Sequence, residues 1–177
     1  MSQAVAASDL KKYIRDIPDF PDKGIVFKDI TPLLKDPFVF KETIDLLANR
    51  FKRENIDCVV GIEARGFIFG SALAYKLGAG VIPVRKKGKL PFKTNSVTYD
   101  LEYGTDTLEI HADAIAADSR VLIVDDVLAT GGTVSAVTKL VRKQNAQIVG
   151  LAFLIELTFL KGREKLKEFP LFSLIQY

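Results

Sequence analysis

The sequence predicts an α/β protein in which helices cover a mainly parallel central sheet. Strand-like and helix-like segments alternate along most of the 177 residues, which is typical of crossover connections between parallel strands. Val121-Leu122-Ile123-Val124 is a run of branched aliphatic residues, as expected for a parallel strand that is covered on both faces. Residues 1–35 do not share this alternation. Their prolines, Pro18, Pro21 and Pro32, predict an irregular segment laid over the core.

The first regular elements follow from capping residues and hydrophobic spacing. Asp36 as N-cap and Pro37 at the first helical position predict the start of a helix. Apolar residues then recur at i, i+3, i+4 and i+7, which continues the helix to about Glu54. Residues 59–62 read as a buried strand, and residues 65–77 as an apolar helix that ends at a glycine.

The second half repeats the pattern after an interruption. Residues 81–84 predict a short strand, whose proline favours an edge or irregular position. Polar and apolar residues alternate from Ser96 to Ile110 around Gly104, which indicates a hairpin or a long flexible flap. The remaining expected elements are a helix at 131–143, a strand at 148–155, a short helix at 161–167 and a strand at 172–175.

Composition limits the class of protein. The formal net charge is +3 and 48% of the residues are hydrophobic, which excludes intrinsic disorder and collagen-like repeats. The one cysteine, Cys58, lies in an apolar run and is interpreted as a core residue rather than a reactive thiol. No apolar run approaches the roughly 18 residues of a membrane helix, and the N-terminal sequence has no secretory signal pattern. We therefore expect a soluble, cytoplasmic protein with no membrane partner.

One structural domain is expected. Residues 1–35 form a covering segment, here called the hood, and residues 36–177 form the core. The core includes a flap at about residues 86–110. Within it, residues 85–93 carry five basic side chains and no acidic one. That run fits a solvated loop, a nucleic-acid patch or a loop that closes over a phosphorylated ligand; the near-neutral remainder of the chain argues against nucleic acid.

The stretch from Val121 to Thr133 carries the chemistry. A buried strand delivers Asp125 and Asp126 to the carboxyl edge of the sheet, where open α/β sheets bind ligands. A turn rich in Thr and Gly then opens a helix, whose free N–H groups and dipole favour a phosphate. The run lacks the Gly-Lys-Ser/Thr of a nucleotide P-loop and the spaced glycines of a dinucleotide fold. It therefore predicts a phosphate cradle beside two carboxylates suited to vicinal hydroxyls.

This run resembles the marker of the type I phosphoribosyltransferases, a family of three-layer α/β enzymes with a mainly parallel sheet, a flexible hairpin flap and a small N-terminal hood. The resemblance implies binding of phosphoribosyl diphosphate. By the same resemblance, the ribose 2- and 3-hydroxyls contact Asp125 and Asp126. The residues implied for the 5-phosphate are Ala129, Thr130, Gly131, Gly132 and Thr133.

Further blocks look like the adenine phosphoribosyltransferases within that family. They occur in the expected order from about Phe20 to Tyr177 and lie at residues 24–34, 63–67, 85–91, 101–104 and 157–163. The resemblance implies that the protein transfers the phosphoribosyl group to adenine, giving AMP and diphosphate in purine salvage. It also implies Mg²⁺ held mainly by substrate oxygens, with no dedicated protein metal site, and a homodimer.

The resemblance also assigns roles to individual residues. Phe27 stacks on adenine, while backbone groups of Val26 and Lys28 read the purine edge. Glu102 and Tyr103 in the flap resemble the catalytic pair of the family. The diphosphate-binding residues implied are Glu63, Ala64, Arg65, Gly66, Arg85, Lys86 and Lys89. Family members often have aspartate and serine where this chain has Glu63 and Ala64, so Ala64 has no hydroxyl to offer.

Two alternatives remain open. The first is a transferase for another base, such as hypoxanthine, guanine, xanthine or orotate; the segment from Ile25 to Leu34 argues against it, because it resembles the adenine-specific version. The second is a ligand sensor that keeps the fold and regulates transcription or binds RNA without turnover. Glu102 and Tyr103 favour catalysis, and the chain has no spare length for a DNA-binding domain, so no nucleic-acid partner is expected.

Overall fold

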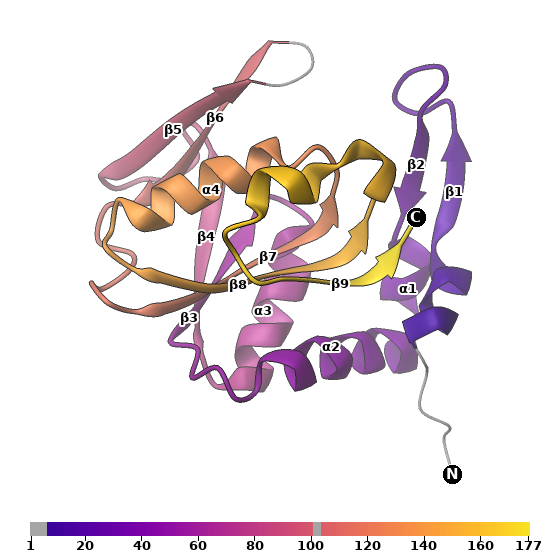
Figure 1. Ribbon diagram of the computed structural model, residues 1–177, viewed down its shortest axis with the longest axis horizontal. Helices are drawn as coiled ribbons and strands as arrows, with labels where there is room; N and C mark the ends of the chain where they lie inside the picture. The colour runs from indigo at the N-terminus through magenta and orange to yellow at the C-terminus, as the bar shows by residue number, and fades with distance from the viewer. Residues whose placement is uncertain (1–6, 101–103) are drawn as a thin grey trace.

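The computed structural model describes residues 7–100 and 104–177. Its centre is a seven-stranded sheet with the order β5-β6-β4-β3-β7-β8-β9, and a separate two-stranded sheet pairs β1 with β2 (Figure 1). The strands are β1 Arg15–Pro18, β2 Val26–Asp29, β3 Cys58–Ile62, β4 Gly80–Lys86, β5 Thr94–Asp100, β6 Thr105–His111, β7 Arg120–Leu128, β8 Gln147–Glu156 and β9 Leu171–Gln176. The α-helices are α1 Thr31–Lys35, α2 Pro37–Phe51, α3 Gly66–Leu77 and α4 Gly132–Arg142. The 3₁₀ helices are η1 Ala7–Tyr13, η2 Thr158–Leu160 and η3 Gly162–Leu166.

The central sheet is mainly parallel, as the sequence predicts. β3 pairs in parallel with both β4 and β7, β7 with β8, and β8 with β9. Only β5 and β6 run antiparallel to their neighbours among the strands of this sheet that the structure describes. The carboxyl ends of the five parallel strands therefore meet at one edge of the sheet.

The sheet is the middle of three layers, because its residues alternate between two cores. On β7, Leu122 and Val124 pack in a cluster with α2 and α3. Val121 and Ile123 point the other way, into a cluster with α4. Figure 1 shows α4 and η3 on one face of the sheet and α2 and α3 on the other. The continuous aliphatic run of β7 is thus explained by burial on both faces.

The predicted helix boundaries hold at the capped ends. The Asp36 side chain accepts hydrogen bonds at 3.0 Å from the N–H groups of Phe38 and Val39, an N-cap that contributes about 1 kcal/mol to stability. α3 ends at Gly78, whose φ of 70° is left-handed. Cys58 is a core residue, as expected, and burial raises the pKa of its thiol to about 11.

Two local predictions need correction. The hood is more regular than its prolines indicated, because β1 and β2 pair as an antiparallel hairpin and α1 follows. The expected helix at 161–167 is a 3₁₀ helix.

The proline of β4 lies in an edge-like position, as the sequence predicts. β4 is an inner strand in the strand order, but β6 pairs with it only at Arg85 and Lys86. Pro83 therefore has β3 on one side and no partner from β6 on the other.

Two hairpins rise on the same side of the core. The predicted hairpin around Gly104 consists of β5 and β6, which pair from Thr94–His111 to Asp100–Thr105. Figure 1 shows this flap and the β1–β2 hairpin of the hood at the top of the view. In the part of the chain that the structure describes, no helix is long and apolar enough to cross a membrane.

Candidate functional site

The candidate site lies at the edge of the sheet where the parallel strands end. The register of β3 with β7 pairs Gly61 with Val124, so the loop after β3 faces the acidic end of β7. A cavity of about 580 Å³ opens between them. It is lined by Glu63, Ala64, Arg65, Lys86, Tyr99, Asp106, Leu108, Asp125, Asp126, Val127, Ala129 and Thr133. Eight of these residues belong to the predicted diphosphate, ribose and phosphate sets from different parts of the chain: Glu63, Ala64, Arg65, Lys86, Asp125, Asp126, Ala129 and Thr133.

The Thr- and Gly-rich turn forms a smaller hollow next to this cavity. Residues 127–134 and Asp125 enclose about 70 Å³. Gly131 is the N-cap of α4 with a left-handed φ of 78°, so the first N–H groups of α4 follow directly. The Thr133 hydroxyl donates to the Tyr99 phenol oxygen at 3.3 Å. The structure thus brings all five residues predicted for the phosphate to one concave loop at a helix N-terminus.

The two neighbouring carboxylates have unusual surroundings. They lie within β7, which continues to Leu128, rather than after the end of the strand. Burial, followed by the charge of Asp126, raises the pKa of Asp125 well above its usual value. Burial also raises the pKa of Asp126, although Arg65 opposes that shift. Arg65 Nε lies 2.7 Å from Asp126 Oδ2 as an ion pair, without hydrogen-bond geometry.

The loop between β3 and α3 approaches these carboxylates closely. The peptide bond between Glu63 and Ala64 is cis. At Gly66, an added Cβ would lie 2.7 Å from the Asp125 Oδ1 atom and 3.0 Å from the Val124 carbonyl oxygen. Only glycine therefore fits at the start of α3, and its small size lets the loop and the carboxylates share one cavity.

The Glu63 carboxylate is turned toward the basic loop. It accepts hydrogen bonds from Lys89 Nζ at 2.5 Å, the Lys86 N–H at 2.9 Å and Arg85 Nε at 3.3 Å. Burial alone raises the pKa of Glu63, but the contacts with Lys89, Lys86 and Arg85 outweigh it and lower that pKa to about 2. Two of the predicted diphosphate cations, Arg85 and Lys89, are thus neutralised by a carboxylate of the same predicted set.

The side chains of Phe27 and Lys28 point to opposite faces of strand β2 in the hood. The Phe27 ring lies under the Arg65 guanidinium at 4.8 Å and meets Phe20 edge to face at 5.2 Å. Lys28 points to the other face, where its ammonium pairs with Asp16 at 2.7 Å and lies 3.8 Å from the centre of the Tyr177 ring. Phe27 therefore shares Arg65 with Asp126, whereas the Lys28 side chain does not face the cavity.

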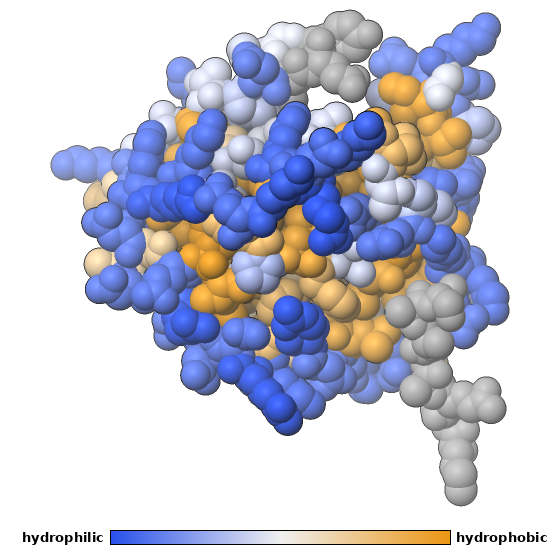
Figure 2. Space-filling view, viewed as in Figure 1, coloured by the Kyte–Doolittle hydropathy of each residue, from blue (hydrophilic) through white to orange (hydrophobic). Residues whose placement is uncertain are grey.

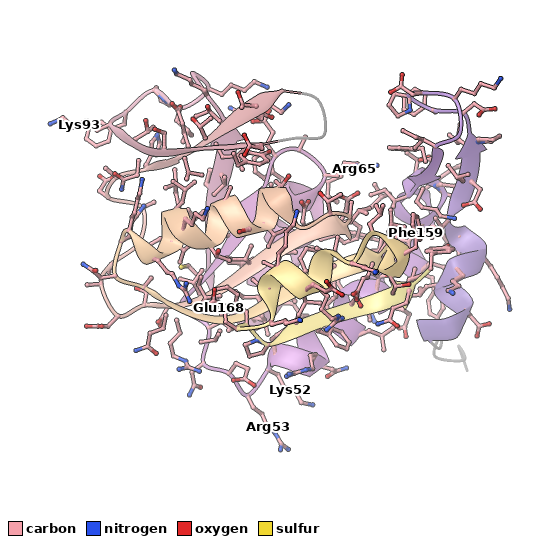
Figure 3. The ribbon with its side chains drawn as sticks, turned by 45° about the horizontal axis from the view of Figure 1, so that its top comes forward. Lys52, Arg53, Arg65, Lys93, Phe159 and Glu168 are labelled. Atoms are coloured by element: carbon pink, nitrogen blue, oxygen red, sulfur yellow. The ribbon has the colours of Figure 1, made fainter. Side chains whose placement is uncertain are left out.

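A second cavity, of about 480 Å³, separates the hood from the segment after β8. It is lined by Asp16, Gly24, Ile25, Val26, Lys28, Leu157, Phe159 and Leu160. Figure 3 shows Arg65 and Phe159 on the side of the core that faces the hood hairpin. Figure 2 shows hydrophobic atoms on the surface of that hairpin. Among the hairpin residues, Ile25 and Val26 are exposed to solvent. The surface of the hood beside this cavity is thus largely apolar.

The flap contributes residues that the sequence reasoning missed. Tyr99 and Asp106 line the larger cavity and are direct cross-strand partners; Asp106 also pairs with Lys86 at 3.2 Å. Because Asp100 pairs with Thr105, the register is not centred on Gly104, and counting outward from that glycine would not have paired Tyr99 with Asp106. The predicted catalytic pair, Glu102 and Tyr103, lies outside the described residues.

Potential metal ligands at the site are carboxylates. Within residues 7–100 and 104–177, no group of three or more His, Cys, Asp or Glu side chains is arranged to hold a metal ion. Asp125 and Asp126 nevertheless place hard oxygen donors at the wall of the larger cavity. Such a pair suits an ion that is bound partly through a phosphorylated ligand.

Comparisons with known proteins agree on one family. Residues 30–172 match the family model described as a phosphoribosyl transferase domain. The adenine phosphoribosyltransferase of Geobacter metallireducens is 63% identical over 169 residues, covering 96% of this chain and 99% of that protein. The adenine phosphoribosyltransferase of Roseiflexus sp. is 59% identical over 170 residues, covering 96% of this chain and 99% of that protein.

Solved structures give the same result. The crystal structure of adenine phosphoribosyltransferase from Thermoanaerobacter pseudethanolicus has a TM-score of 0.94 at 53% identity and covers 97% of this chain and all of that one. The enzyme from Saccharomyces cerevisiae, solved with an imino-altritol bisphosphate and adenine, has a TM-score of 0.90 at 45% identity, with 95% and 97% coverage.

The ion contacts of Glu63 make a pH-dependent contribution to stability. Because the pKa of Glu63 in the folded protein is lowered to about 2 from 4.5, its stabilising effect is complete above about pH 5 and is lost as the pH falls toward 2. Glu63→Gln should therefore lower the free energy of unfolding by roughly 1 kcal/mol at pH 7, a value reduced by the solvent exposure of Lys89. Urea unfolding of both proteins at pH 7, 4 and 3 should show the difference shrinking. A constant difference would contradict this origin, and Lys89→Met should reduce the same pH dependence.

Proposed function

This chain belongs to the adenine phosphoribosyltransferase family of the phosphoribosyltransferases, and we propose how its own residues divide the reaction of that family. The protein transfers the 5-phosphoribosyl group from phosphoribosyl diphosphate to adenine, giving AMP and diphosphate, a step of purine salvage. The observation that carries the assignment of residues is one shared cavity. Two carboxylates, a glycine-rich helix N-terminus and a basic loop all open onto it or border it.

The sugar phosphate is assigned to the β7–α4 turn. Ala129 to Thr133 bind the 5-phosphate through the first N–H groups of α4 and the Thr130 and Thr133 hydroxyls. Asp125 and Asp126 accept hydrogen bonds from the ribose 2- and 3-hydroxyls. The ion pair of Asp126 with Arg65 supports this role, because hydroxyl donors can replace a cation at the same oxygen.

The diphosphate is assigned to the loop 63–66 together with Arg85, Lys86 and Lys89. Gly66 brings the α3 N-terminus close to the acidic end of β7, and Ala64 can contribute only backbone atoms. Glu63 acts as an internal counter-ion, since its carboxylate already binds Lys89 and Arg85. A diphosphate carries more charge than that carboxylate and competes for the same cations.

Adenine is assigned to the hood. Phe27 supplies an aromatic face, and the planar Arg65 guanidinium lies over that face at 4.8 Å, where a flat base can stack instead. β2 pairs with β1 along one edge, and no other described strand pairs with its second edge. Backbone groups of Val26 and Lys28 on β2 can therefore read the purine. A backbone carbonyl oxygen can accept a hydrogen bond from the exocyclic amine of adenine. A 6-oxo purine has a carbonyl oxygen in place of that amine, so two acceptors would face each other and both would lack a donor.

The reaction displaces diphosphate from C1 of the sugar by N9 of adenine. We assign the management of the purine proton to Glu102 and Tyr103. Flap closure over the cavity would keep water from the activated sugar; Tyr99 of the flap already contacts Thr133. The carboxylates Asp125 and Asp126 could help to hold a Mg²⁺ ion bound mainly by substrate oxygens, and such an ion would supply neutralisation of charge on the leaving diphosphate. We also propose a cytoplasmic location for the enzyme.

The choice of base can be tested directly. The purified protein is assayed for nucleotide formation from phosphoribosyl diphosphate and Mg²⁺ with adenine, hypoxanthine, guanine or orotate in parallel. The kcat/KM for adenine should exceed that for each other base by at least about a hundredfold, because mismatched bases leave polar groups unpaired. Faster turnover with another base would overturn the roles of Val26, Phe27 and Lys28. Binding of phosphoribosyl diphosphate without any turnover would favour a ligand sensor.

The catalytic pair can be tested by removing the Glu102 carboxylate. Glu102→Ala should lower kcat by about a hundredfold or more, a magnitude typical of a lost general acid or base, while binding of phosphoribosyl diphosphate changes less than about threefold. Asp113→Ala removes an exposed carboxylate at the base of the flap and should leave both quantities unchanged. Equal kcat values for Glu102→Ala and the unaltered enzyme would remove Glu102 from the mechanism.

We further propose a homodimer that uses α3. Ile68 and Tyr75 lie one heptad apart on one face of this helix and are 40% and 90% exposed. Size-exclusion chromatography with light scattering should give twice the chain mass of 19.6 kDa. The double variant Ile68→Asp/Tyr75→Lys should shift that mass toward the monomer. If the double variant stays dimeric with an unchanged dimer dissociation constant, the interface does not use this face of α3.

A further inference from the structure

The segment between β8 and β9 lies against the turn assigned to the 5-phosphate. At Gly162, an added Cβ would collide with the Ala129 carbonyl oxygen and lie 2.9 Å from the Gly131 nitrogen. At Gly131, an added Cβ would lie 2.6 Å from the Gly162 carbonyl oxygen. The two backbones are therefore in direct contact with no side chain between them. The position of Gly162 consequently limits where the 129–131 backbone can lie.

The residue after Gly162 is held by a two-pronged ion pair. Arg163 donates from Nε to Glu156 Oε1 at 2.8 Å and from Nη2 to Glu156 Oε2 at 2.5 Å. A third donor, Nη1, reaches the Leu171 carbonyl oxygen at 3.3 Å. This geometry needs a planar guanidinium, because one ammonium group cannot make the parallel pair of hydrogen bonds. Arg163 thus fixes the start of η3 from one side.

The carboxylate that receives Arg163 is itself fixed. Glu156 is only 3% exposed and also accepts a hydrogen bond from the Ser173 hydroxyl at 2.6 Å. It ends β8 and pairs in register with Leu128 of β7, the residue before Ala129. The Leu157 N–H donates to the Leu128 carbonyl oxygen at 2.9 Å. Glu156 therefore has a set position relative to the entry of the phosphate turn.

We propose that the Glu156–Arg163 pair positions the 129–133 turn for the 5-phosphate by holding Gly162 against it. Neither charged group lines the site cavities, so both are positioning residues that act through the Gly162 backbone. The ligand affected is a sugar phosphomonoester. The inference rests on the proposed assignment of residues 129–133 to the 5-phosphate, and it extends that site to Glu156 and Arg163.

The chain contains a matched control for the pair. Arg142 at the end of α4 makes the same two-pronged contact with Glu168, at 3.3 Å and 2.6 Å. Both side chains of this pair are exposed, Arg142 at 53% and Glu168 at 56% of its side-chain surface. Arg142→Lys therefore removes a comparable two-pronged contact, also joined to the 161–168 region, without altering the contact between Gly162 and the phosphate turn.

The test compares binding of two probes, ribose 5-phosphate and inorganic diphosphate, by calorimetry. Arg163→Lys and Glu156→Gln should each raise the Kd for ribose 5-phosphate by about tenfold, because the turn loses its preorganisation. The Kd for diphosphate should change less than about twofold, since residues 63–66 and 85–89 are not held by this pair. In kinetics, the KM for phosphoribosyl diphosphate should rise while kcat and the KM for adenine stay within about twofold. Arg142→Lys should change none of these values.

Thr133→Val tests the phosphate site separately from the positioning role of the ion pair, because it removes a hydroxyl from the turn itself. Weaker ribose 5-phosphate binding by Thr133→Val, with full affinity in Arg163→Lys, would overturn the positioning role and leave the phosphate site in place. Full affinity in both variants would overturn the phosphate assignment as well. Equal loss of both probes in Arg163→Lys, matched by Arg142→Lys, would show a general loss of folded protein and would also overturn the proposal.

Discussion

The site depends on the parallel pairing of β3, β7 and β8, because that register brings distant loops to one edge of the sheet. Gly61 opposite Val124 and Leu128 opposite Glu156 set the positions of the 63–66 loop, the phosphate turn and the segment after β8. A slip of one residue would move each of the two acidic side chains of β7 to the other face of the sheet and shift Asp125 away from Gly66. The aliphatic side chains that fix this register are buried in two cores. The side-chain packing that fixes the strand register therefore also fixes the geometry of the ligand site.

Charges within the site are satisfied by one another before any ligand arrives. Glu63 neutralises the basic loop, and Arg65 spans from Asp126 to the Phe27 ring. Buried or half-buried ions of one sign would otherwise be costly. In the proposed assignment, diphosphate replaces the Glu63 carboxylate at the basic loop, the ribose hydroxyls replace the Arg65 guanidinium at Asp126, and adenine replaces the same guanidinium at Phe27. Binding under this proposal is an exchange of partners, and its net free energy is smaller than the individual contacts suggest.

Features written in local sequence could be predicted, whereas those set by distant contacts could not. The aliphatic run from Val121 predicted a strand that is buried on both faces, and Asp36 predicted the start of a helix. Both features depend on one residue or on a short run of residues. The hood hairpin was missed since its prolines resemble an irregular segment until β1 meets β2. Tyr99 and the Glu156–Arg163 pair were missed for a related reason. Nothing near them in the sequence shows which loop they will contact after folding.

The backbone contact between Gly131 and Gly162 also limits how this enzyme can evolve. Neither residue has a side chain to shorten, so a methyl group gained at one position cannot be offset by a smaller residue at the other. The same contact restricts the length of the segment after β8, because an inserted residue would move Gly162 away from Ala129. A side chain at either glycine therefore requires the backbone at the other to move. Divergence of this region is expected in the residues around them, such as the exposed Phe159.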